Sequence, residues 1–164
     1  MDGPMGRLGR MLIAPKVKRQ IERGSDLYNS GDTEGALECF TTAVELDDEH
    51  EEAHYYLAMA LMDLKRHQEA EVHFRRSIEA KDNISRTHAD FAELLHHMGQ
   101  KEEAEAEYRR ALDLDPANAI AIMNLGTLLR DMGRFSEATD LYRKAKDLPD
   151  LDEESRKQLE EMMI

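Results

Sequence analysis

Residues 104–145 read AEAEYRRALDLDPANAIAIMNLGTLLRDMGRFSEATDLYRKA. The stretch holds one pattern twice: a small residue, a large aromatic four positions later, and another small residue three positions after that. Ala104, Tyr108 and Ala111 form the first copy, and each of these positions recurs 34 residues later. A fixed period of this length is the sequence signature of a repeat architecture.

The same pattern continues towards the N-terminus without an insertion. The first small position recurs as Ala36 and Ala70, and the aromatic position as Phe40 and Phe74. Two further positions recur upstream of the small and aromatic residues in every copy. The first holds a small residue, in Gly24, Ala58, Ala92 and Gly126. The second holds leucine, in Leu27, Leu61, Leu95 and Leu129. Registers that persist through four copies predict four equivalent structural units.

Each unit is predicted to contain two helices joined by a tight turn, because apolar residues recur at helical spacing on both sides of a breaker. Glycine in three of the turns supplies the left-handed backbone that ends a helix. Lys65 fills that position in the second unit, which predicts either a strained backbone or a different turn. The expected helices span residues 17–30, 33–46, 51–64, 67–80, 85–98, 101–114, 119–132 and 135–148.

The period and the pattern resemble the tetratricopeptide-repeat family, most clearly at Ala104, Tyr108 and Ala111 and at Asp115–Pro116. The resemblance implies an all-α fold, a right-handed superhelical solenoid of helix-turn-helix repeats. The four repeats would occupy residues 17–50, 51–84, 85–118 and 119–150. Since no single repeat buries its apolar face alone, stacking of neighbours would stabilise the array.

Both ends of the chain depart from the pattern. Gln20 and Arg23 are polar where later copies have apolar residues. Polar residues fit these positions in a first repeat, because it has no preceding repeat to pack on. After Pro149, acids and then apolar residues at helical spacing predict a capping helix within residues 151–164. Residues 1–16 are expected to be a basic, flexible segment, with packing on the first helix or a targeting role as alternatives.

Composition narrows the classes of partner. The 164 residues carry a net charge of −13, which disfavours nucleic acid because phosphate binding needs clustered Lys and Arg. The charge is uneven: residues 1–20 carry +4, so the remainder carries −17. No apolar run is long enough for a membrane span. Cys39 is the single cysteine, so an intrachain disulfide is excluded and a reducing, cytoplasmic location is expected.

The resemblance also implies that the first helix of each repeat lines a concave groove that binds a partner. Several of its inward positions are aromatic or methionine, and flexible methionines can repack against a partner. Packing on neighbouring side chains is the alternative interpretation. Acids around these positions predict a basic partner with apolar anchors. The candidate partner-binding residues are Tyr28, Tyr55, Tyr56, Met59, Met62, Asp90, Glu93, Met123, Asn124 and Arg130.

One subset of the family grips the C-terminal carboxylate of chaperone tails with a clamp of Lys, Asn, Asn, Lys and Arg. The corresponding positions here are Ile21, Ser25, Tyr56, Arg86 and Asp90, and only Arg86 is compatible. An aspartate in the last position would repel the carboxylate. Moving the frame by one repeat gives Tyr55, Met59, Asp90, Ile120 and Asn124, which fits no better. The chain is therefore predicted not to bind chaperone tails in this way.

Catalytic, cofactor and metal sites are not expected. His54 and His88 stand 34 residues apart at equivalent positions, which predicts a packing role. Glu93 and His97 share a helix face without further ligands at matching spacing. No phosphate-binding loop or nucleophile elbow occurs. The sequence thus predicts a non-catalytic scaffold or adaptor, monomeric or weakly homo-oligomeric, with a self-associating assembly module as the alternative.

Overall fold

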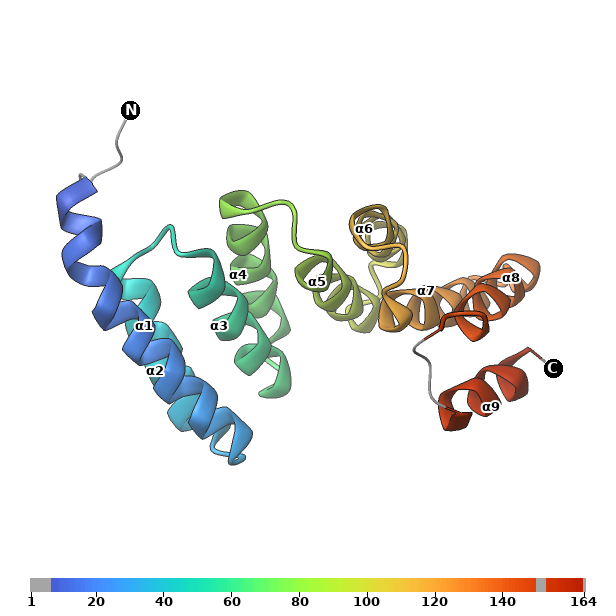
Figure 1. Ribbon diagram of the computed structural model, residues 1–164, viewed down its shortest axis with the longest axis horizontal. Helices are drawn as coiled ribbons and strands as arrows, with labels where there is room; N and C mark the ends of the chain where they lie inside the picture. The colour runs from blue at the N-terminus through green and yellow to red at the C-terminus, as the bar shows by residue number, and fades with distance from the viewer. Residues whose placement is uncertain (1–6, 150–152, 164) are drawn as a thin grey trace. The chain divides into compact units, whose positions relative to one another are not determined.

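The computed structural model describes residues 7–149 and 153–163. Every regular element in those ranges is an α-helix (Figure 1). The chain divides into two compact units, Met1–Asp82 with α1–α4 and Asn83–Ile164 with α5–α9. The helices are α1 (Arg7–Asn29), α2 (Thr33–Leu46), α3 (Glu51–Asp63), α4 (His67–Ala80), α5 (Ser85–His97), α6 (Lys101–Leu114), α7 (Ala119–Asp131), α8 (Phe135–Lys146) and α9 (Glu153–Met162).

The predicted helices agree with the structure from the second onward. α2 to α8 begin at the predicted residues and end within two residues of the predicted ends. Each first helix packs on the second helix that follows it, as in α1 with α2 and α5 with α6. The all-α repeat fold is therefore confirmed.

The start of α1 corrects the sequence prediction. α1 begins at Arg7 rather than residue 17, so residues 7–16 are helical where a flexible segment was expected. Residues 1–6 lie outside the described residues. Pro15 lies inside the helix and removes the N–H that would bond to the carbonyl of Met11. Because Met11 is exposed, water can bond to that carbonyl instead.

The four turns inside the helix pairs share one backbone conformation. Gly31, Gly99 and Gly133 have φ values of 89°, 77° and 78°, and Lys65 has a φ of 61°. Two residues before each of them, a first helix ends, and a bond of the Schellman type closes the turn, such as Arg134 N–H to the Leu129 carbonyl at 2.8 Å. Lys65 therefore adopts the strained conformation, the first of the two alternatives predicted for it.

The repeated small and aromatic residues form the core of each helix pair. Phe40, Phe74, Tyr108 and Tyr142 are at most 1% exposed, and the small residues four positions before them are fully buried. A Cβ atom added at Gly126 would overlap with the Tyr142 ring, and one at Gly24 would lie 2.5 Å from Phe40 Cε1. Small residues are thus required where the aromatic ring of the second helix contacts the first.

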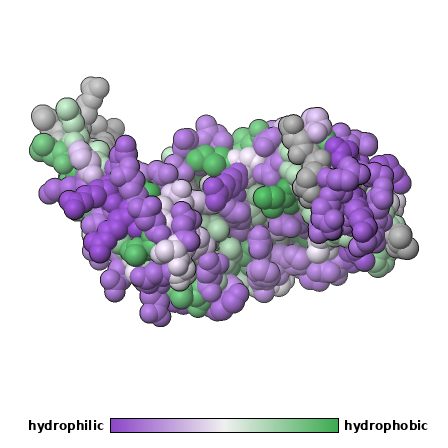
Figure 2. All heavy atoms as spheres, turned by 60° about the horizontal axis from the view of Figure 1, so that its bottom comes forward, coloured by the Kyte–Doolittle hydropathy of each residue, from purple (hydrophilic) through white to green (hydrophobic). Residues whose placement is uncertain are grey.

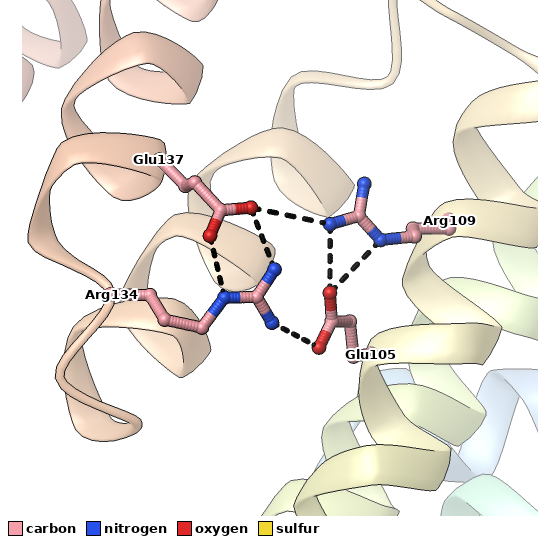
Figure 3. Close-up of polar contacts among 4 residues, drawn as sticks. All are labelled: Glu105, Arg109, Arg134 and Glu137. Carbon is pink, nitrogen blue, oxygen red and sulfur yellow. Dashed lines mark hydrogen bonds and ion pairs between the residues drawn. The ribbon is translucent and has the colours of Figure 1, made fainter.

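A network of arginines and glutamates joins α6 to α8 in the second unit (Figure 3). Glu105 accepts hydrogen bonds from Arg109 at 2.7 Å and from Arg134 at 2.6 Å. Arg134 also donates to Glu137, which lies in the first turn of α8. Burial alone would raise the pKa of Glu105, but the two arginines lower it below its ordinary value. The network therefore fixes the second helices of two successive repeats to one another.

The C-terminal helix α9 packs on α8. Leu159 is fully buried, and Arg156 donates to the carbonyls of Lys146 and Leu148 at 2.8 and 2.9 Å. Lys146 forms an ion pair with Glu160. These bonds satisfy carbonyl groups at the C-terminal end of α8, which would otherwise lack helical partners. A helix was predicted here; residues 150–152, which precede it, lie outside the described residues.

Candidate functional site

The candidate residues of the first unit lie along α3, with Tyr28 reaching them from α1. Tyr56, Met59 and Asp63 follow one another at helical spacing and therefore share a side of α3. The Tyr28 hydroxyl donates to the carboxylate of Asp63. We call Tyr28, Tyr56, Met59, Met62 and Asp63 the first-unit face; its aromatic and methionine side chains are partly exposed.

Aromatic packing explains why these side chains are only partly exposed. The Tyr56 ring stacks on Phe40 of α2, with centroids 5.3 Å apart and planes inclined by 14°. Tyr55 meets Tyr56 edge-on at 5.2 Å and Phe74 of α4 at 6.2 Å. Tyr56 therefore has one side held by Phe40 while part of its surface stays accessible.

Tyr55 corrects the prediction for this face. Its side chain was assigned to the partner-binding surface, but it is only 6% exposed and belongs to the core. Its edge-on contact with the fully buried Phe74 is the physical reason. Ile21, which took the first clamp position in the chaperone-tail comparison, is buried as well, against Val17 and Ala43.

The candidate residues of the second unit gather around one phenol group. Tyr108 of α6 is buried, and the Asn124 side chain of α7 hydrogen-bonds its hydroxyl. Burial, with the nearby charges of Glu93 and Asp90, raises the pKa of Tyr108, so the phenol stays protonated. Asp90 also pairs with Arg86 of α5 at 3.5 Å. The structure thus brings Asp90, Glu93 and Asn124 together.

Met123 and Arg130 complete this set on α7. They are seven residues apart and therefore share one side of α7, about a third of a turn from Asn124, and Met123 is partly exposed. Arg130 is exposed, and its guanidinium donates to the Met162 carbonyl of α9 at 3.4 Å. We call Asp90, Glu93, Met123, Asn124 and Arg130 the second-unit face.

One pair of residues that links successive first helices recurs in both units and was missed from the sequence. In the first unit Tyr28 of α1 bonds to Asp63 of α3, and in the second unit His96 of α5 contacts Asp131 of α7 at 2.9 Å. Each pair is 35 residues apart, and the second pair follows the first by two repeat periods. This repeated spacing is the sequence pattern from which the two pairs could have been predicted. In both units, the last residue of one first helix is an aspartate that contacts the first helix of the preceding repeat.

The histidines at the repeated position are structural, as predicted. His54 and His88 are 4% and 2% exposed. His54 contacts His73 through their Nδ1 atoms at 2.9 Å, and His88 contacts Glu107 at the equivalent position at 2.6 Å. Since Nε2 of His54 faces the Asp48 carbonyl at 3.0 Å, that nitrogen carries the proton and Nδ1 accepts one from His73.

This pair predicts an acid-sensitive first unit. Burial and the adjacent His54 lower the pKa of His73 to about 4 from an ordinary 6.5. Below pH 6.5 the unfolded chain takes up a proton that the folded chain refuses, so the free energy of unfolding falls as the pH drops towards 4. His73→Asn, which keeps a donor near Nδ1, is expected to reduce this fall. Urea unfolding at about pH 7 and about pH 5.5 measures the difference.

Exposed His97 supplies the control, because His97→Asn removes a histidine that lies on the surface. This variant should keep the pH dependence of the parent. If the free energy of unfolding falls equally between these two pH values in His73→Asn and in the parent, His73 does not couple folding to pH.

The visible surface is mostly hydrophilic, with hydrophobic residues in separate spots (Figure 2). Among the described residues, no group of three or more His, Cys, Asp or Glu side chains is placed to hold a metal ion. No helix in the described part of the chain has both the length and the apolar character needed to cross a membrane.

Solved structures with the same fold extend over most of the chain. MamA from Desulfovibrio magneticus RS-1 matches with a TM-score of 0.77 and 20% identity, over 90% of this chain and 83% of that chain. PilF from Pseudomonas aeruginosa matches with a TM-score of 0.78 and 19% identity, over 90% and 74%. The first TPR of Spaghetti (RPAP3), bound to the HSP90 peptide SRMEEVD, matches with a TM-score of 0.71 and 21% identity, over 73% and 94%. At these identities the likeness shows the fold.

Comparison with curated protein sequences found no match. A family model described as "Tetratricopeptide repeat" matches residues 21–83 and again residues 90–153, which together make up most of the sequence. The two matched stretches contain the repeated small and aromatic positions and all four Schellman-type turns. The chain therefore belongs to the tetratricopeptide-repeat family.

Proposed function

We propose that this chain is a non-catalytic adaptor whose first-unit face binds a protein segment that carries basic charge and apolar anchors. The observation that carries the proposal is the strip of partly exposed Tyr56, Met59 and Met62 on α3. The second-unit face, which includes the partly exposed Met123, is proposed as a further contact surface. A cytoplasmic location, expected from the single cysteine, remains part of this proposal.

The cores of the helix pairs do not account for the methionines on this strip. The small and aromatic residues of each pair are buried to 1% exposure or less, and they fill the space between the two helices. Met59 and Met62 stand outside that set and keep part of their surface accessible. Methionine is flexible and polarizable, so such side chains can adapt to a partner of irregular shape.

Acidic side chains surround the strip and indicate the charge of the partner. Glu52 precedes Tyr56 by one helical turn, and Asp63 follows Met59 by one turn. Basic residues on a partner would be attracted to this face, which would raise the association rate, and the attraction would weaken with salt because these acids are exposed. Apolar anchors against Met59 and Met62 would set the lifetime of the complex.

The complex of the RPAP3 domain with a peptide supports a peptide as the kind of ligand that this fold can hold. The peptide SRMEEVD contains three acids. Here the first-unit face is itself acidic, and only one of the five clamp positions of the chain holds a compatible residue, so a peptide of that kind is not the proposed ligand.

Selection of random peptides displayed on phage against the full chain tests the proposal. Selected peptides are expected to be enriched in Lys and Arg together with large apolar residues. The double variant Met59→Gln with Met62→Gln keeps side-chain length and helix propensity but removes the apolar anchors. We expect it to weaken binding of the selected peptides by at least about tenfold in fluorescence anisotropy, the size typical of central anchor residues.

Val72→Gln is the matched control, because Val72 is 56% exposed on α4, a second helix. This variant should bind the selected peptides like the parent chain. Thermal unfolding of all three proteins checks that the folds are equally stable. Undiminished binding by the Met59→Gln/Met62→Gln variant would contradict the proposal.

A further inference from the structure

The first part of α1 extends beyond the helices that pack on it. α1 has 23 residues and α2 has 14, so α1 is longer by about 13 Å at 1.5 Å per residue. The surplus is at the N-terminal end, where Figure 1 shows the first turns of α1 without a helix beside them. The core residues of α1 start only at Val17, which is fully buried. We call residues 7–16 the α1 extension.

The α1 extension combines apolar side chains with basic charge. Met11 and Leu12 are 76% and 73% exposed, and hydrophobic surface is visible at this end of the molecule in Figure 2. Residues 7–19 contain five basic residues and no acid. By helical position, Met11 and Leu12 lie on the same side as exposed Arg19, opposite the buried Val17. This is the chemistry that the first-unit face is proposed to bind.

The charge of the rest of the first unit is opposite. Residues 20–82 carry 16 acids and six basic residues, a net charge of −10. Six of the acids lie within residues 45–52, at the junction of α2 and α3, just before the first-unit face. An acidic surface with apolar residues therefore stands beside a basic helix with apolar residues in one chain.

Geometry prevents the α1 extension from binding the first-unit face of its own chain. The extension is continuous with the remainder of α1, which itself contributes Tyr28 to that face. To fold back, α1 would have to break, although it is a continuous helix from Arg7 through Pro15 to Asn29. A second copy of the chain has no such restriction.

We propose that the α1 extension of one chain binds the first-unit face of a second copy, with Met11 and Leu12 against Met59 and Met62. The proposal rests on the function proposed above, since it uses the same face. Because the two surfaces differ, the contact is heterologous, and each chain keeps one free surface after it binds. Assembly therefore ends at a dimer only if two chains exchange their extensions; otherwise it proceeds to open chains or larger rings.

Sedimentation velocity of the full-length chain over a range of concentrations tests this assembly. The parent is expected to form dimers or larger species as its concentration rises, and fewer of them at high salt. Met11→Gln with Leu12→Gln removes the anchors of the extension, and Met59→Gln with Met62→Gln removes those of the face. Each double variant alone should need at least about tenfold higher concentration to associate. Val72→Gln should associate like the parent.

Mixing the two double variants gives the decisive result. One retains its first-unit face and the other its α1 extension, so an equimolar mixture has one intact contact and should stop at a heterodimer. If the mixture shows no heterodimer although both variants are folded, or if Met11→Gln/Leu12→Gln associates like the parent, the proposed contact is wrong.

A parent chain that stays monomeric at every concentration also overturns the proposal. Flotation with vesicles containing phosphatidylserine then distinguishes a different role, because a monomer that binds them through Met11 and Leu12 would use the extension for an anionic lipid surface. None of these outcomes decides the peptide selection, which depends on the first-unit face and not on the α1 extension. Failure of the assembly and failure of the proposed function are thus separate results.

Discussion

Replacement of Ala104 by tryptophan is expected to unfold the second unit at temperatures where the parent is folded. Ala104 is fully buried at the contact of α5 with α6, one turn before Tyr108, which is itself 1% exposed. An indole there has no space to occupy, and overpacking of a dense core costs about 1–3 kcal/mol or more. We expect a loss at or above about 3 kcal/mol of unfolding free energy, measured by urea unfolding.

Ala106 on the same helix provides a matched control. Its side chain is exposed, so Ala106→Trp adds the same atoms where solvent can accommodate them. The change in unfolding free energy should stay within about 0.5 kcal/mol, as is usual for surface substitutions. Similar losses at the two positions would show that the register of α6 assigned from the repeat is wrong.

Leu159→Asp is expected to release α9 from α8. Leu159 is fully buried, and a carboxylate introduced there would lose its hydration. An isolated ten-residue helix is unstable in water, so α9 should unfold once it is undocked. Hydrogen exchange followed by mass spectrometry should show loss of protection throughout α9.

The neighbouring Gln158 is exposed, and Gln158→Asp introduces the same charge without burying it. Protection of α9 should persist in this control. Retained protection in Leu159→Asp would show that α9 does not depend on its apolar contact with α8.

The repeat period predicted most of the fold. Helix starts at Thr33, Lys101 and Phe135 followed from the turns before them, because a left-handed residue and a small residue at a helix contact leave few alternatives. The start of α1 could not be predicted in this way. A proline inside a helix looks like a boundary in sequence, and only the exposure of Met11 shows that the freed carbonyl can reach water.

The candidate site was harder to predict, because helical spacing shows which side of a helix carries a residue but not how deeply its side chain is buried. It assigned Tyr55 and Tyr56 to the same surface, although contact with Phe74 buries the first and stacking on Phe40 leaves part of the second accessible. Hydrogen bonds between helices also depend on side-chain reach, which sequence spacing does not contain. The bond from Tyr28 to Asp63 is an example.

The most direct test of the account follows the methyl groups of the methionines by NMR while a selected basic peptide is added to the full chain. The account predicts that the Met59 and Met62 signals shift first and saturate with the peptide, while Met98, at the C-terminal end of α5, stays unchanged. Saturating shifts at Met98 or other methionines outside the two faces, with Met59 and Met62 unmoved, would contradict the claim that the first-unit face binds the partner.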